Sequence, residues 1–186
     1  PSIDFSLYGN KIKINAAKLK NAINNVIFAT SQTSEEIILS GVNFKYENGL
    51  LMITATDSFR LAKKYLIIDQ ENPTINVIIP SKNLEELNKI LEESEEIVQI
   101  HFLKTKVLFK YKNILFLSRL IEGTFPNTSS IIPTEYAISV KFNKNDIISA
   151  IDRASLFNTT ESPSTIKMII DEEKVTGVIV AGDVYD

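Results

Sequence analysis

The stretch IKINAAKLKNAINNVIFA, residues 12 to 29, has a counterpart later in the chain, VKFNKNDIISAIDRASLF, residues 140 to 157. The two stretches align without a gap at a constant offset of 128 residues, 140 minus 12. Each begins with alternating apolar residues, as a strand does, and passes through an Asn (Asn15 or Asn143) at the position of a helix N-cap. Apolar residues at helical spacing follow in both, and the first helix is expected over residues 15 to 29. The sequence therefore predicts two copies of one strand-and-helix unit.

The segments that follow the two helices support this duplication. The first helix is followed by the polar loop ATSQTSEE and the strand-like IILSGVNF, and the second by NTTESPS and TIKMIID. One matching helix is a common coincidence, but the order strand, cap, helix, loop and strand is not. In the second helix we expect Ile147, Ile151 and Ala154 to be buried, as we expect for the apolar stripe of the first.

The first copy continues far enough to indicate its fold class. Residues 36 to 57 predict two strands around a turn at Glu47-Asn48-Gly49. Two further strands, a second helix over residues 81 to 94 and a three-stranded meander up to residue 121 follow. We expect Ser81 to cap the second helix, with Glu85 and Glu86 in its first turn. Because two helices are too few to cover both faces of a parallel sheet, the unit is expected to be α+β and mostly antiparallel.

The composition gives no support for catalysis. The 186 residues include no Cys and one His, His101, in an expected strand. Disulfides and thiolate chemistry are therefore excluded, and neither a Ser-His nor a Cys-His nucleophile has a sequence signature. Phosphate-binding Gly-rich loops are also absent from the sequence. We expect no catalytic residue, no metal site and no cofactor.

The ends and the charge of the chain give broader expectations. No apolar run of about 18 residues and no secretory signal is found in the sequence, which favours a cytoplasmic protein. The first residue is Pro1 instead of Met, so we expect a piece of a longer protein. A net charge of −3 does not exclude nucleic-acid binding, because the field depends on where the charges lie.

The polar faces of the three expected helices carry Lys, Arg and Asn side chains. The first helix is free of acids although the chain as a whole is acidic. These faces are either simply solvated or directed at one phosphate backbone, which such side chains would bind without reading its sequence. The candidates for facing DNA are Lys18, Lys20, Asn21, Asn25, Lys82, Lys89, Asn145 and Arg153.

Four segments resemble the bacterial sliding clamps, the beta subunits of DNA polymerase III. ATDSFRLA, residues 55 to 62, is similar to a motif of that family, and so is LIEGTFPNTSSIIP, residues 120 to 133. LSGVNF at residue 39 resembles the strand before the family's first hairpin. PSIDF at the start resembles the loop that closes the preceding domain. The resemblance covers essentially the whole chain and preserves the order and spacing of the motifs.

The resemblance implies a DNA clamp fold of three similar domains per subunit, with helices inside and antiparallel sheets outside. Two subunits would close into a homodimeric ring around double-stranded DNA, a processivity factor without chemistry of its own. Residues 1–8 would then end the first domain, 9–133 would form the middle domain, and 134–186 would begin the third. The implied partners are the polymerase III alpha subunit, the clamp loader and other clamp-binding peptides.

In that family the segment matching residues 56–61 lines a pocket for short linear peptides. Carried over to this sequence, the pocket residues are Leu39, Thr56, Ser58, Phe59, Arg60, Leu61, Pro126, Ser130 and Ile131. Two departures matter: Phe59 stands where the family usually has His, and Ser130 stands where some members carry Arg. An aromatic residue and an Arg are favoured anchors at interfaces.

Three alternatives remain open at the level of sequence. Arg60 could serve only a surface salt bridge. The chain could be a peptide-binding module without a DNA role, or an α+β enzyme with its site around Asp57 and Arg60.

Overall fold

The computed structural model describes residues 10–33, 36–156, 165–170 and 175–180, and the chain divides into two compact units between Thr128 and Ser129. None of the helices in these described ranges is long and apolar enough to cross a membrane. The first unit contains β1 (Asn10–Asn15), α1 (Ala16–Asn24), η2 (Ile27–Ala29), η3 (Ile37–Ser40), β2 (Gly41–Glu47), β3 (Leu50–Thr56), β4 (Leu61–Ile67), β5 (Ile75–Pro80), α2 (Ser81–Ile90), β6 (Ile97–Phe102), β7 (Lys106–Tyr111) and β8 (Ile114–Arg119), where η marks a 3₁₀ helix.

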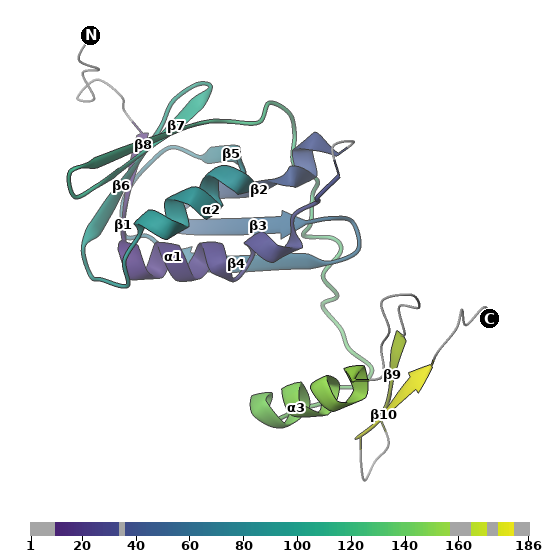
Figure 1. Cartoon of the computed structure of the whole chain (residues 1–186). Coiled ribbons are helices and arrows are strands. Elements are labelled where there is room, and N and C mark those ends of the chain that lie inside the picture. The colour runs from purple at the N-terminus through teal and green to yellow at the C-terminus, as the bar shows by residue number, and fades with distance from the viewer. Residues whose placement is uncertain (1–9, 34–35, 157–164, 171–174, 181–186) are drawn as a thin grey trace. The chain divides into compact units, whose positions relative to one another are not determined.

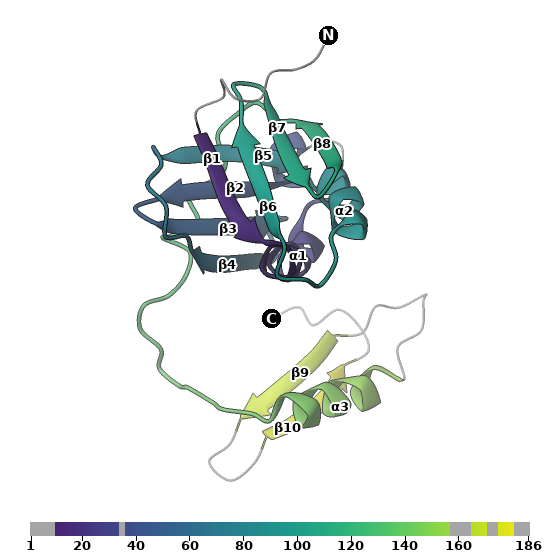
Figure 2. The ribbon, with the colours of Figure 1, turned by 90° about the vertical axis from the view of Figure 1, so that its left-hand side faces the viewer.

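Two four-stranded antiparallel sheets form this unit, with strand orders β4-β3-β2-β5 and β1-β6-β7-β8. In Figure 1, α1 and α2 lie next to each other across one face of the first sheet. One hydrophobic core joins both sheets and both helices, as shown by the fully buried Ile12, Leu19, Phe44 and Leu84 and by Phe109. The view in Figure 2 shows the second sheet in front of the first, with its strands running in a different direction. The α+β, antiparallel prediction is confirmed.

The Asn-Gly turn lies where the sequence predicts it. Glu47 of β2 pairs with Leu50 of β3, and the two residues between them have φ of 50° at Asn48 and 79° at Gly49. Positive φ at both central residues is the geometry of the tight hairpin turn that matches strand twist. The local sequence alone therefore fixes this register.

The first helix is shorter than expected. Asn15 caps it as predicted, because its side chain accepts a hydrogen bond from the Lys18 backbone N–H at 3.0 Å. The helix ends at Asn24 and not at residue 29, and one 3₁₀ turn, η2, follows. Asn disfavours helix interiors because its side chain competes for backbone hydrogen bonds. Two consecutive Asn, Asn24 and Asn25, mark the end.

The expected cap of the second helix is wrong. Ser81 is the first residue inside α2, and the N-cap position belongs to Pro80, which supplies no side-chain hydrogen bond. β5 pairs with β2 up to Pro80, so the helix starts directly at the end of the strand. Glu85 and Glu86 consequently lie beyond the first turn.

The second unit consists of α3 (Lys144–Ser155) and an antiparallel hairpin of β9 (Thr165–Ile170) and β10 (Val175–Val180). Asn143 caps α3 by accepting hydrogen bonds from the backbone N–H groups of Asn145 and Asp146, at 2.9 and 3.4 Å. The strand expected just before this cap, at residues 140 to 143, is not formed. Its counterpart β1 is held by β6, and the described part of the second unit contains no strand equivalent to β6.

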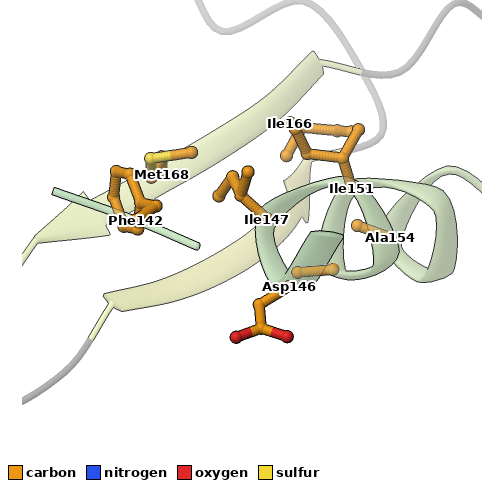
Figure 3. Close-up of a pocket in the computed structure, with 8 residues that line it drawn as sticks. Phe142, Asp146, Ile147, Ile151, Ala154, Ile166 and Met168 are labelled. Atoms are coloured by element: carbon orange, nitrogen blue, oxygen red, sulfur yellow. The ribbon is translucent and has the colours of Figure 1, made fainter. Parts of the chain in front are cut away.

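An apolar groove runs between α3 and β9 (Figure 3). It is lined from α3 by Ile147 and Ile151 and from β9 by Ile166 and Met168. Ile151 is 41% exposed and no residue of α3 is fully buried, so the expected burial of this stripe is wrong for this chain. The helix forms, but only one side of its apolar face is covered.

Candidate functional site

The corner between β3 and β4 is built around the carboxylate of Asp57. The strands pair up to Thr56 and Leu61, leaving four residues to turn the chain. Asp57 Oδ1 accepts hydrogen bonds from the backbone N–H groups of Phe59 and Arg60, at 3.1 and 2.9 Å. Because the Arg60 N–H stabilises the charged form most, the pKa of Asp57 is lowered from its usual value. This carboxylate holds the turn together.

Thr56 and Ser58 complete the corner. The Thr56 hydroxyl donates to the Arg60 carbonyl at 2.7 Å and accepts from the Ser58 N–H at 3.2 Å. Ser58 has φ of 74°, a left-handed conformation that small polar residues tolerate better than bulky ones. The polar cluster Thr56-Asp57-Ser58 is therefore explained by the turn itself.

The corner presents two large side chains outward. Phe59 lies within the turn of the corner and is 98% exposed. Arg60 donates from Nε to Asp57 Oδ2 at 2.9 Å, and its guanidinium carbon lies 5.6 Å from the centre of the Phe28 ring. The salt bridge considered for Arg60 is thus present, and a cation–π contact adds to it. Both oxygens of Asp57 serve the corner, so an enzyme site there gains no support.

A second, smaller hydrophobic cluster contains Leu39, one of the expected pocket residues. Leu39, Ile78 and Phe125 pack together, and the Leu39 carbonyl accepts a hydrogen bond from the Ser31 N–H at 2.9 Å. The returning chain comes so close that a Cβ on Gly123, at φ of 136°, would lie 2.3 Å from a side-chain atom of Ile38. A glycine is needed there on both counts.

The structure distributes the predicted pocket residues over both units. Leu39 is buried, and Thr56 and Leu61 are half-buried. Ser58, Phe59, Arg60 and Pro126 are exposed on the first unit, and Ser130 and Ile131 are exposed on the second. The structure brings residues 56 to 61 together in one corner.

Sequence reasoning did not select Phe28 or Phe125 for the site. The sequence places Phe28 in the apolar pattern that the two copies share, within a helix expected to extend to residue 29. The helix ends at Asn24, and the Phe28 ring is 56% exposed below Arg60. The Asn24-Asn25 pair was the available signal for this change of direction.

The candidate DNA-facing residues of α1 differ in availability. Lys18, Asn21 and Asn25 are exposed, and the Asn25 amide donates to the Asn21 side chain at 2.8 Å. Lys20 is half-buried and donates from Nζ to the carbonyl of Leu91, just past the end of α2, at 2.7 Å. It therefore satisfies an orphan carbonyl of the neighbouring helix.

The remaining candidates lie on the other two helices. Lys82 and Lys89 of α2 are exposed, and Lys89 pairs with Glu86 at 2.6 Å, which raises the pKa of Lys89. Asn145 and Arg153 are exposed on α3 of the second unit.

The acidic run EESEE, residues 92 to 96, closes the N-terminus of α1. The N–H groups of Ala16 and Ala17 donate to the carbonyls of Glu96 and Ser94, at 2.8 and 3.0 Å. The Asn15 amide donates to the Glu95 carboxylate. Together with Glu93, Glu95 shares a hollow with residues of α1, including Lys18. The sequence of α1 contains no acidic residue, but in the folded structure Glu93 and Glu95 lie beside its polar face.

Comparisons with known proteins agree on one family. Residues 13–127 match the family described as DNA polymerase III beta subunit, central domain. The beta sliding clamp of Bacillus subtilis is 43% identical over 158 residues, 84% of this chain and 42% of that protein. The crystal structure of a Bacillus subtilis DNA polymerase sliding clamp matches with a TM-score of 0.83 and 37% identity, over 97% of this chain and 50% of that one.

A third match carries a bound compound. It is a sliding clamp, a DNA polymerase III subunit beta, from Bartonella birtlesii, solved with griselimycin. Its TM-score is 0.78 at 28% identity, over 97% of this chain and 54% of that one. This chain thus spans about half the length of the relatives it matches.

Proposed function

Because the chain belongs to the DNA polymerase III beta subunit family, we propose that it works as part of a sliding clamp, which surrounds duplex DNA and tethers the polymerase to it. The match over residues 13–127 carries this proposal. The family name and the duplicated Asn-capped helix agree, since a ring of repeated domains needs equivalent helices on its inner wall.

The proposed domains follow from this ring. Residues 1–8 end one domain, 9–133 form the middle one and 134–186 begin the next. The full-length subunit forms a homodimer in the cytoplasm, performs no catalysis, and is engaged by the clamp loader and the polymerase alpha subunit.

The exposed helix residues suit a DNA contact without sequence reading. Lys18, Lys82 and Arg153 offer charge, and Asn21 offers hydrogen bonds to phosphate oxygens. The acids beside α1 weaken the attraction. In a closed ring this is no defect, because the ring holds DNA by topology and must slide along it.

The corner at residues 56–61 is proposed as one wall of a site for short peptides from partner proteins. Phe59 offers an exposed apolar ring, and Arg60 offers hydrogen-bond donors beside it. Leu61 and Pro126 of the same unit contribute apolar surface, and Leu39 belongs to the small hydrophobic cluster with Phe125. Griselimycin, which the Bartonella birtlesii protein carries, is a suitable probe.

A loading experiment tests the proposal. The full-length protein is loaded on a nicked circular DNA by its clamp loader and challenged with rising salt. We expect retention on the circle at moderate salt and rapid loss after the circle is cut. Arg60→Ala should weaken both loading and polymerase tethering, because the clamp loader and the polymerase are proposed to use the same site. The protein that is loaded should still be retained until the circle is cut. Release that depends on salt alone and is indifferent to cutting would contradict the ring.

A further inference from the structure

Phe28 lies outside every element that the peptide site was expected to use. It belongs to η2, the 3₁₀ turn after α1, and η2 packs against both β3 and β4. The segment therefore sits beside the two strands that end in the corner. Its ring is half exposed, and the Arg60 guanidinium lies above its face.

We propose that Phe28 is a positioning residue for the peptide site: its ring fixes the plane of the Arg60 guanidinium, so that the terminal nitrogens face a bound peptide. The inference rests on the proposed function of the corner. It adds a residue from a distant segment and a chemical class for the contact, a carbonyl or carboxylate oxygen of the ligand.

The Asp57 contact alone cannot fix the guanidinium. It joins one nitrogen, Nε, to one oxygen at 2.9 Å, and a single hydrogen bond leaves the planar group free to rotate about it. An aromatic face on one side of the plane removes this freedom, because a guanidinium stacks on such faces. Two constraints from two segments define one orientation.

The donors that remain determine the ligand chemistry. A guanidinium has five N–H donors and no acceptor. Within the described ranges, the side-chain hydrogen bond of Arg60 is the one from Nε to Asp57. The four N–H groups on the terminal nitrogens are left for a ligand. Peptide backbone carbonyls and acidic side chains supply the matching acceptors.

The test is a double-mutant cycle on the full-length protein, with griselimycin as the probe and calorimetry as the measurement. Phe28→Met removes the ring but keeps the apolar bulk, whereas Phe28→Tyr keeps the ring. We expect Phe28→Met to weaken binding about two- to fivefold, the worth of an exposed cation–π contact, and Phe28→Tyr to leave it unchanged. In an Arg60→Ala background, Phe28→Met should have no further effect.

Each other outcome overturns the inference. Equal weakening by Phe28→Met with and without Arg60 would show direct contact or a general structural role. Unchanged binding in Phe28→Met, or in Arg60→Ala, would show that the pair plays no part. Wild-type protein that fails to bind griselimycin would overturn the proposed peptide site itself. Retention of the same variants on circular DNA, measured relative to the amount loaded, reports separately on the ring.

Discussion

Helices α1 and α3 have matching sequences but different surroundings. In α1 the stripe Leu19, Ala22, Ile23 and Val26 (the last just past its end) is fully buried, whereas the equivalent stripe of α3 lines an open groove (Figure 3). In the first unit α2 and two sheets cover this stripe, but in the second the described residues offer only the β9–β10 hairpin. Periodicity thus determines which face is apolar, and the neighbours determine whether that face is buried.

The N-caps behave in the opposite way. Asn15 and Asn143 accept the same kind of backbone hydrogen bond in both units. A cap needs only the residues of its own first turn, so it forms wherever the helix forms. The two copies therefore share the helix cap, which depends on neighbouring residues, but not the long-range packing of the apolar stripe.

The largest expected difference between the helices comes from truncating the stripe. Leu19→Ala should lower the free energy of unfolding of the first unit by about 2–5 kcal/mol, because it opens a cavity in a closed core. Ile147→Ala, its counterpart by position, removes a side chain that is only half-buried and should cost much less. Urea unfolding followed by circular dichroism, with hydrogen exchange of the α3 amides, measures both. Equal losses would contradict the contrast.

Changing the caps should give a smaller effect. Asn15→Ala and Asn143→Ala should each destabilise their helix by about 1 kcal/mol. Asn15→Asp and Asn143→Asp provide the sharper comparison. An Asp keeps the acceptor and suits a helix N-terminus, so Asn143→Asp should be tolerated. Asn15→Asp places a second carboxylate beside Glu95 and should destabilise. If Asn15→Asp and Asn143→Asp shifted the midpoint of thermal unfolding equally, the conclusion that only Asn15 has a long-range partner would be wrong.

The two Lys residues of α1 are expected to have different roles: Lys18 contacts DNA, and Lys20 contacts the protein itself. Lys18→Gln should reduce the salt slope of DNA binding by the full-length protein by about one, the loss of one phosphate contact. Lys20→Gln should leave the slope nearly unchanged and lower stability instead, because Lys20 bonds the carbonyl of Leu91. Binding constants at several salt concentrations test this. A larger slope change for Lys20 would reverse the assignment.

The smallest expected effect concerns pH at the corner. The pKa of Asp57 is lowered from 3.8 by the Arg60 and Phe59 N–H groups and the Arg60 side chain. A carboxyl whose pKa is lowered on folding stabilises the turn at any pH above its unfolded value. That contribution is lost as the pH falls through the lower, folded value. An NMR titration of the Asp57 carboxyl should have its midpoint below 3.8. Asp57→Asn should loosen the corner above that midpoint, where the wild-type carboxylate is charged, and should differ little from the wild type below it.

The predictable part of the fold was the local part. Asn15, Asn143 and the Asn48-Gly49 turn depend on neighbours in sequence and were found where expected. The strand expected at residues 140 to 143 depends on a partner strand and did not form. Ser81 failed as a cap because pairing between β5 and β2 extends to Pro80.

The candidate site shows the same division. The corner at residues 56–61 is one continuous segment, so its motif pointed to it directly. Phe28 reaches the corner only because α1 ends early and η2 packs on β3 and β4. The acids beside Lys18 belong to residues 92 to 96. Backbone hydrogen bonds hold this segment against the start of α1, and no local sequence pattern predicts them.

The proposed function requires α1 and α3 to be equivalent helices turned toward DNA. Photo-crosslinking tests it in the full-length protein loaded on circular DNA, with the reactive residue placed at Asn21 or at its counterpart Ser149, both exposed. Lys45 is the control, because strand alternation puts it on the sheet face opposite the buried Phe44. We predict crosslinks from both helix positions and none from position 45. Crosslinks from position 45, or from neither helix, would contradict the account.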